Sequence, residues 1–285
     1  MKQEIIFGLA LGGGGARGSV HIGVLMELER FSLWPDIVTG TSIGGLVGAL
    51  VASGLDSEQI TRVFRQMRFG QMYAMPWQKP ALMDTHKLEK LLQDTIGRPT
   101  FDDLEIPLAV IATDLVNRVE VVIETGDVVS AVLATTAFPV IFAPVNRNSQ
   151  TLIDGGVLNN TPFNVAQERG AKHVLAIDLA NSAPYGTEVP YPPRNNFLTR
   201  FLTRAQRDPM YQAVSTLADI MTAQNVKQHL KVAKPDVFLQ PDVGNIGLFD
   251  FHRLDDGIAL GREAAQSANK EMRELAERVR EAHGN

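Results

Sequence analysis

The clearest structural signal in this chain is the stretch Ile37-Val38-Thr39-Gly40-Thr41-Ser42-Ile43-Gly44-Gly45. A β-branched run precedes its core, Gly40-x-Ser42-x-Gly44, and an apolar segment rich in alanine and glycine follows it over residues 46–53. Between a strand and a helix, G-x-S-x-G is typical of a nucleophile elbow. A serine on such a strained turn needs small neighbours, and the next helix directs its N–H groups at the reacting oxygen. The alternative is a serine that only caps the helix.

The composition is that of an ordinary globular protein. The chain has 285 residues, 45% hydrophobic and 21% charged, enough for one large domain or two modest ones. It contains no cysteine, which excludes disulfides and thiolate metal sites, and its net charge of −5 argues against a nucleic-acid partner. No signal peptide is recognisable, and the longest weakly polar run, residues 43–55, is too short and glycine-rich to span a bilayer. We expect a cytoplasmic protein with at most peripheral contact with the inner membrane.

Strands and helices alternate along the chain. Buried strands are predicted at residues 5–11, 36–39, 107–113, 119–123, 173–179 and 235–239. Helices are predicted from residue 19, at 57–68, 85–96 and 128–136, from Thr161-Pro162 and at 208–232. Apolar residues spaced by three and four from Ile258 to Val279 predict one long amphipathic C-terminal helix. The order favours an α/β fold with a mainly parallel central sheet.

A glycine loop, Gly12-Gly13-Gly14-Gly15-Ala16-Arg17-Gly18, separates the first strand from the first helix. Gly13-x-Gly15-x-x-Gly18 matches the dinucleotide fingerprint, but that motif expects an acid at the end of the second strand, and Asp36 begins that strand instead. A P-loop fails because no lysine follows Gly18. The remaining use is to present backbone N–H groups to an anion, here the oxyanion formed beside Ser42. Arg17 adds positive charge, unless it is a solvated arginine at the helix start.

Ser42 requires a base to act as a nucleophile. The preferred candidate is Asp154 in Leu152-Ile153-Asp154-Gly155-Gly156, because an aspartate followed by two glycines at a strand end can approach another loop closely. The alternative for Asp154 is an ordinary turn former. A carboxylate with a pKa near 4 is a weak base for a hydroxyl, so the catalytic role requires a partly desolvated aspartate.

Histidine bases are less favoured. A Ser-Asp-His order is formally available through Asp178 and His252, but only two predicted strands precede Ser42, fewer than in α/β-hydrolases. His21 lies on the first predicted helix, where a packed or capping role is more common. Asp114, also at a strand end, is interpreted as structural.

These motifs together resemble those of the patatin-like phospholipase family, its bacterial members in particular. The resemblance rests on four blocks in the family's order: Gly13-Gly14-Gly15-Ala16-Arg17-Gly18 as oxyanion loop, Gly40-Thr41-Ser42-Ile43-Gly44 as nucleophile box, Ala134-Thr135-x-Ala137-x-Pro139-x-x-Phe142-x-Pro144, and Asp154-Gly155-Gly156 followed by Asn160-x-Pro162. Thr135 stands where the third block usually has serine, a departure that touches no catalytic atom. The blocks span more than half of the chain.

The resemblance implies a three-layer α/β/α fold and a serine acyl hydrolase, a phospholipase, lysophospholipase or esterase, that cleaves fatty acyl esters of lipids. In this scheme Ser42 attacks the carbonyl, Asp154 transfers the proton, Arg17 supports the site, and no metal or cofactor is required. The oxyanion donors implied are the N–H groups of Gly13, Gly14, Gly15 and Ile43. The alternative is a catalytically weak regulatory or scaffold protein that keeps the fold.

We expect a single domain over residues 1–285, with a lid or interfacial region around 185–235. Two acid-free stretches, residues 59–83 and 189–207, combine basic and aromatic side chains. The first contains Arg62, Phe64, Arg65, Arg68, Phe69, Tyr73, Trp77 and Lys79. Such stretches suit a surface that meets anionic lipid headgroups, so we expect them to flank the acyl channel. The alternative is ordinary packing with a solvated rim, or a dimer contact in a homo-oligomer.

Overall fold

The computed structural model describes residues 4–67, 85–139, 142–180, 209–244, 246–248 and 250–284. Its strands are β1 (Phe7–Leu11), β2 (Ile37–Thr41), β3 (Leu108–Asp114), β4 (Val119–Ile123), β5 (Val145–Arg147), β6 (Gln150–Asp154), β7 (His173–Ile177) and β8 (Val237–Leu239). Its helices are α1 (Ser19–Arg30), α2 (Ile43–Ala52), α3 (Ser57–Gln66), α4 (Thr85–Ile96), α5 (Val128–Thr135), α6 (Phe163–Glu168), α8 (Pro209–Val232), α9 (Leu254–Ser267) and α10 (Asn269–His283).

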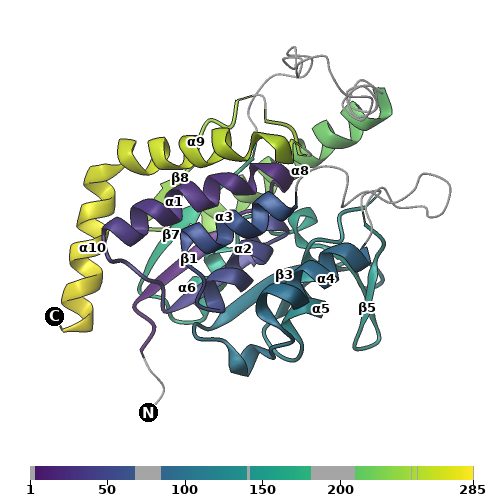
Figure 1. The fold of residues 1–285 in the computed structure, drawn as a ribbon, viewed down its shortest axis with the longest axis horizontal. Helices are drawn as coiled ribbons and strands as arrows, with labels where there is room; N and C mark the ends of the chain where they lie inside the picture. Colours follow the sequence, from purple (N-terminus) through teal and green to yellow (C-terminus); the bar gives the residue numbers. More distant parts are fainter. Residues whose placement is uncertain are drawn as a thin grey trace.

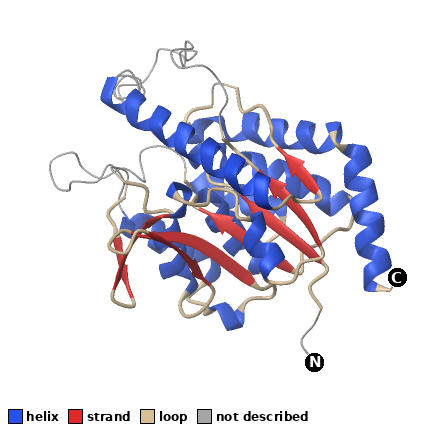
Figure 2. Ribbon diagram, turned by 180° about the vertical axis from the view of Figure 1, so that it is seen from behind, coloured by secondary structure: helices blue, strands red, loops and turns tan. Residues whose placement is uncertain are grey.

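The strands form one mixed sheet between two helical layers, the predicted three-layer α/β/α fold (Figures 1 and 2). The order is β5-β6-β3-β2-β1-β7-β8, with β4 also paired to β3. From β3 through β2, β1 and β7 to β8, all neighbours are parallel, as predicted for the centre of the sheet. The sheet edge beyond β3 is antiparallel, through β4, β6 and β5.

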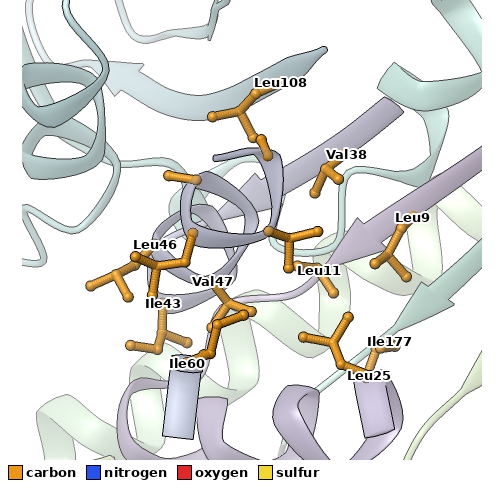
Figure 3. Close-up of a cluster of buried hydrophobic side chains, with 14 of the residues drawn as sticks. Leu9, Leu11, Leu25, Val38, Ile43, Leu46, Val47, Ile60, Leu108 and Ile177 are labelled. Carbon is orange, nitrogen blue, oxygen red and sulfur yellow. The ribbon is translucent and has the colours of Figure 1, made fainter. Parts of the chain in front are cut away.

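The core occupies both faces of the sheet because helices cover both faces. Leu9 and Leu11 of β1 belong to a large cluster on the side of α1, α2 and α3, whereas Ala10 between them packs with Phe163 of α6 on the other side. Figure 3 shows part of the large cluster, in which Ile43 and Leu46 of α2 lie close to the ends of the central strands. This packing fixes the start of α2, and therefore Ser42, against the sheet.

The prediction of one long C-terminal helix is wrong. The chain leaves the helical conformation at Ala268, with φ −92° and ψ 24°, and Figure 1 shows α10 turned across the direction of α9. Ser267 and Asn269 flank the break, and both residue types compete with the helical backbone for hydrogen bonds. The apolar spacing continues through the break, since Met272 and Val279 of α10 are buried as well. Periodicity alone therefore did not reveal the turn.

The structure covers only part of the first basic and aromatic stretch. Phe64 of α3 is buried, Arg62 pairs with Glu58 at 2.6 Å, and Arg65 lies 3.5 Å from Asp255. This part packs as an ordinary amphipathic helix. Residues 68–84 and the whole stretch 189–207 lie outside the described residues, as does the part of the region 185–235 that precedes α8. Among the helices of the described ranges, none has the length and apolar character that a membrane span requires.

Candidate active site

Ser42 occupies a strained turn between β2 and α2. Its φ of 55° and ψ of −125° lie in a region that residues with a side chain rarely adopt, at a cost of about 1–3 kcal/mol. The two glycines of the motif are needed for steric reasons. A Cβ on Gly40 would lie 2.5 Å from the carbonyl oxygen of Gly44, and a Cβ on Gly44 would overlap the carbonyl oxygen of Leu11. Ser42 thus has the backbone geometry of a nucleophile elbow.

The block of residues 134–139 supports both predicted catalytic residues. The Ser42 N–H donates a hydrogen bond to Thr135 Oγ1 at 2.9 Å, and that hydroxyl in turn donates to the carbonyl oxygen of Ile111. Two residues further on, the carbonyl oxygen of Ala137 accepts the N–H of Asp154 at 3.1 Å. Thr135 touches no reacting atom, as expected, but it holds the backbone of the nucleophile. Sequence reasoning missed this role.

Asp154 ends β6 and is buried, with 2% of its surface exposed. Its Oδ1 accepts the Gly156 N–H at 2.8 Å, whereas its buried Oδ2 has no hydrogen-bond partner of good geometry within the described residues. Burial raises the pKa of Asp154 to about 6, against the smaller opposing effects of the Ser42 hydroxyl and the Gly156 N–H. The structure therefore brings Ser42 and a desolvated Asp154 together.

The glycine loop lies directly beside Ser42. A Cβ on Gly13 would be 3.1 Å from the Cβ of Ser42. The Gly13 N–H donates to the Asn160 carbonyl oxygen at 3.1 Å, and the Asn160 side chain donates back to the Gly13 carbonyl oxygen at 3.3 Å. No hydrogen bond within the described ranges uses the N–H groups of Gly14 and Gly15. Ile43 begins α2, where the first N–H groups have no carbonyl partner in the helix.

Arg17 is buried rather than solvated, with 2% of its surface exposed. Its Nε donates to the carbonyl oxygen of Ile246 at 2.8 Å. Its two terminal nitrogens form a fork with the carboxylate of Asp219 on α8, at 2.7 and 3.2 Å. The alternative of a solvated arginine is therefore wrong. The pattern of the sequence offered no signal for Asp219, which lies 202 residues away.

His21 packs under the glycine loop. It is completely buried, and its Nε2 lies 2.8 Å from the Gly12 carbonyl oxygen. Burial is the larger influence on this side chain and lowers the pKa of His21 to about 4, so the ring is neutral at pH 7. This placement agrees with the interpretation of His21 as a packed residue.

The other acids considered from the sequence have structural partners. Asp178 accepts hydrogen bonds from the Thr161 hydroxyl at 3.0 Å and from the Gln240 side chain at 2.9 Å. His252 faces a different acid, Asp250, at 3.9 Å. Asp114 accepts the N–H groups of residues 116 and 117, which holds the β3–β4 turn.

Ser42, Asp154 and the three glycines Gly13 to Gly15 share one cavity of about 300 Å³. Its walls are mostly apolar and include Leu46, Met67, Leu88, Phe138, Phe142 and Phe251. A concave site with a few polar groups in an apolar lining is typical of a small-molecule site. In the parts of the chain that the structure describes, no cluster of three or more histidines and acids could hold a metal ion.

Fold and site together define an α/β protein in which an elbow serine and a buried aspartate line an apolar cavity. The profile of the family described as patatin-like phospholipase matches residues 9–166, more than half of the chain. The chain belongs to the patatin-like phospholipase family, as the sequence motifs predicted. The crystal structure of VipD from Legionella pneumophila shares the fold, with a TM-score of 0.53 at 14% identity, covering 96% of this chain and 67% of that chain.

Curated relatives are longer proteins. An uncharacterized NTE family protein of Mycobacterium bovis is 29% identical over 272 residues, which cover 92% of this chain and 46% of that protein. The neuropathy target esterase of Drosophila melanogaster is 31% identical over 182 residues, covering 61% of this chain and 13% of that protein. The lysophospholipase NTE1 of Candida albicans is 26% identical over 275 residues, covering 90% of this chain and 19% of that protein. The chain thus spans less than half the length of these relatives.

Proposed function

We propose that this protein is a serine acyl hydrolase that cleaves fatty acyl esters of lipids, with phospholipids or lysophospholipids as the substrate class. The observation that carries the proposal is the strained Ser42 beside the desolvated Asp154 in an apolar cavity. The names of the relatives, which include a lysophospholipase and an esterase, support the same chemistry.

In the proposed mechanism, Ser42 Oγ attacks the ester carbonyl and Asp154 accepts the hydroxyl proton. With its pKa raised to about 6, Asp154 is charged at pH 7 and is a stronger base than an ordinary carboxylate. Asp154 then gives the proton to the leaving alcohol, which leaves the acyl group on Ser42. A water molecule attacks the acyl-enzyme, Asp154 takes its proton, and returns it to Ser42 as the fatty acid departs.

The oxyanion of each tetrahedral intermediate is proposed to bind the N–H groups of Gly14, Gly15 and Ile43. These donors have no other partner in the described structure or, for Ile43, within the helix. A single donor of this kind contributes about 3–4 kcal/mol to transition-state stabilisation. Gly13 has a different role in this scheme, because its N–H is bound to Asn160 and holds the loop in place.

Contact with a lipid surface is also proposed, at the mouth of the cavity. Leu217 of α8 lines the cavity and is 56% exposed, and Ile220 on the same helix is 54% exposed. Exposed apolar side chains on a helix that lines a lipid site suit peripheral membrane contact. We propose a cytoplasmic protein that meets the inner membrane in this way, without crossing it.

Fluorophosphonate labelling, followed by turnover on a panel of defined lipids, tests the proposal. A fluorophosphonate reacts with an activated serine, so the wild-type protein is expected to be labelled. Ser42→Ala should abolish labelling and Asp154→Asn should weaken it strongly, with Asp102→Asn, an exposed acid, as a matched control. A wild-type protein that is neither labelled nor active on any lipid would favour the regulatory or scaffold alternative.

A further inference from the structure

Helix α8 is tied by polar contacts to both loops that form the candidate active site. Asp219 and Asn225 supply the contacts, and Thr222 between them lies against Gly156. These residues are spaced by three, which places them on one side of the helix. Asp219 and Thr222 line the cavity.

The contact of Asp219 fixes the glycine loop. Arg17, its partner, lies within the short 3-10 turn Gly15–Gly18, which directly follows Gly14. The fork is short, and only 3% of the Arg17 side chain and 21% of the Asp219 side chain are exposed. Asp219 is also the only acid within residues 209–232. Because a two-pronged arginine–carboxylate contact defines orientation as well as distance, α8 sets the position of this turn and of the N–H groups beside it.

The contact of Asn225 fixes the loop after Asp154. Its Nδ2 donates to the carbonyl oxygen of Val157 at 2.6 Å and to that of Gly156 at 3.3 Å. Gly156 is the residue whose N–H binds Asp154 Oδ1. Asn225 therefore binds the carbonyl side of Gly156, the residue whose N–H binds the carboxylate of Asp154.

We propose that Asp219 and Asn225 are positioning residues, which make α8 a fixed wall of the active site rather than a lid that opens over it. Asp219 acts on the oxyanion donors through Arg17, and Asn225 acts on Asp154 through Gly156. The inference rests on the proposed hydrolase function. It assigns the segment 209–232, part of the region expected to form a lid, to the catalytic framework.

The two views of α8 predict opposite effects when its contacts are removed. For a lid held shut by these contacts, loosening the helix exposes Ser42 and speeds its reaction with a small soluble probe. For a positioning wall, loosening the helix misplaces the donors and Asp154. A displacement of about 1 Å in an active site can reduce the rate of reaction about 100-fold.

The test compares Asp219→Asn and Asn225→Asp with two matched controls. Asp219→Asn keeps the size of the side chain and removes its charge, and Asp102→Asn makes the same change at an exposed site. Asn225→Asp replaces the N–H donor by an acceptor facing two carbonyls, and Gln224→Glu makes the same change at the exposed neighbour. The readouts are the rate of fluorophosphonate labelling, kcat and KM on a short soluble ester, and thermal unfolding.

We expect both test variants to be labelled about 10- to 100-fold more slowly than wild type, with a matching loss in kcat and little change in KM. The controls should react as wild type, and all variants should unfold cooperatively. Where a test variant does not fold, Asp219→Ala or Asn225→Ala replaces it. Labelling at the rate of the controls, or faster, would overturn the proposal. Failure of the wild-type protein to be labelled would instead count against the hydrolase function.

Discussion

Replacing Asp154 by asparagine is predicted to stabilise the folded protein near neutral pH while it removes activity. The reason is the burial of a charged carboxylate. Its pKa rises from the ordinary 3.8 to about 6 on folding, so the folded chain binds this proton more tightly than the unfolded chain does. Since each factor of ten in proton affinity corresponds to ~1.4 kcal/mol, the difference is about 3 kcal/mol.

The sign of the effect follows from proton linkage. Below about pH 3 the carboxyl is neutral in both states, and its burial does not oppose folding. As the pH rises toward 6, the unfolded chain releases the proton first, and the free energy of unfolding falls. Above about pH 7 the loss is complete, at about 3 kcal/mol. Asparagine keeps an oxygen that can accept the Gly156 N–H, and it carries no charge at any pH.

Urea unfolding of wild type and Asp154→Asn at several pH values between 4 and 8 measures this difference. The variant should gain about 1 kcal/mol over wild type at pH 5 and about 2 kcal/mol at pH 7 and 8, relative to the difference at pH 4, where the unfolded carboxyl is already partly ionised. Asp102→Asn, at an exposed site, should show no such trend. A difference between Asp154→Asn and wild type that stays constant from pH 4 to 8 would refute the assignment of a desolvated, ionised Asp154.

Two further predictions concern Asp154 and Thr135. The kcat/KM of wild type should be half-maximal near pH 6 and fall tenfold per pH unit below it, because Asp154 must be charged to act as a base. A kcat/KM that is level from pH 5 to 8 would contradict this prediction. Thr135→Val should destabilise the fold by about 2–6 kcal/mol and slow labelling of Ser42, because it leaves the Ser42 N–H and the Ile111 carbonyl unpaired at about 1–3 kcal/mol each. Thr135→Ser, which keeps the hydroxyl, should retain the labelling rate, and urea unfolding with fluorophosphonate kinetics compares the two variants.

The elbow could be predicted from the sequence because its causes are local. The β-branched run, the glycines at 40 and 44 and the apolar helix that follows determine where Ser42 lies, whatever the rest of the chain does. The glycine loop is local in the same sense, since steric limits select its residues. Asp154 was identified as the candidate base from its two following glycines and from the family resemblance. The sequence analysis required this aspartate to be desolvated, but only the structure shows that it is buried.

The remaining parts of the site depend on contacts between distant segments. Nothing near Asp219 or Asn225 in the sequence distinguishes α8 from any polar helix, and their roles exist only because α8 lies across the two loops. From the sequence, the Gly13 N–H was expected to be an oxyanion donor, whereas in the structure it donates to the Asn160 carbonyl oxygen. The break at Ala268 was hidden because the spacing of buried residues continues across it.

The base strength of Asp154 and its cost to the stability of the fold have the same origin, the free energy of removing the carboxylate from water. The cavity walls that exclude water from the carboxylate raise its pKa, and the same exclusion opposes folding above pH 6. Ser42 adds about 1–3 kcal/mol of backbone strain at the neighbouring position. Residues that hold these two groups in place, such as Thr135 and Asn225, thus contribute stability that offsets the cost of the strained serine and the buried carboxylate. A variant that admits water to Asp154 should therefore gain stability and lose base strength by related amounts. A variant that gained both stability and base strength would contradict this common origin.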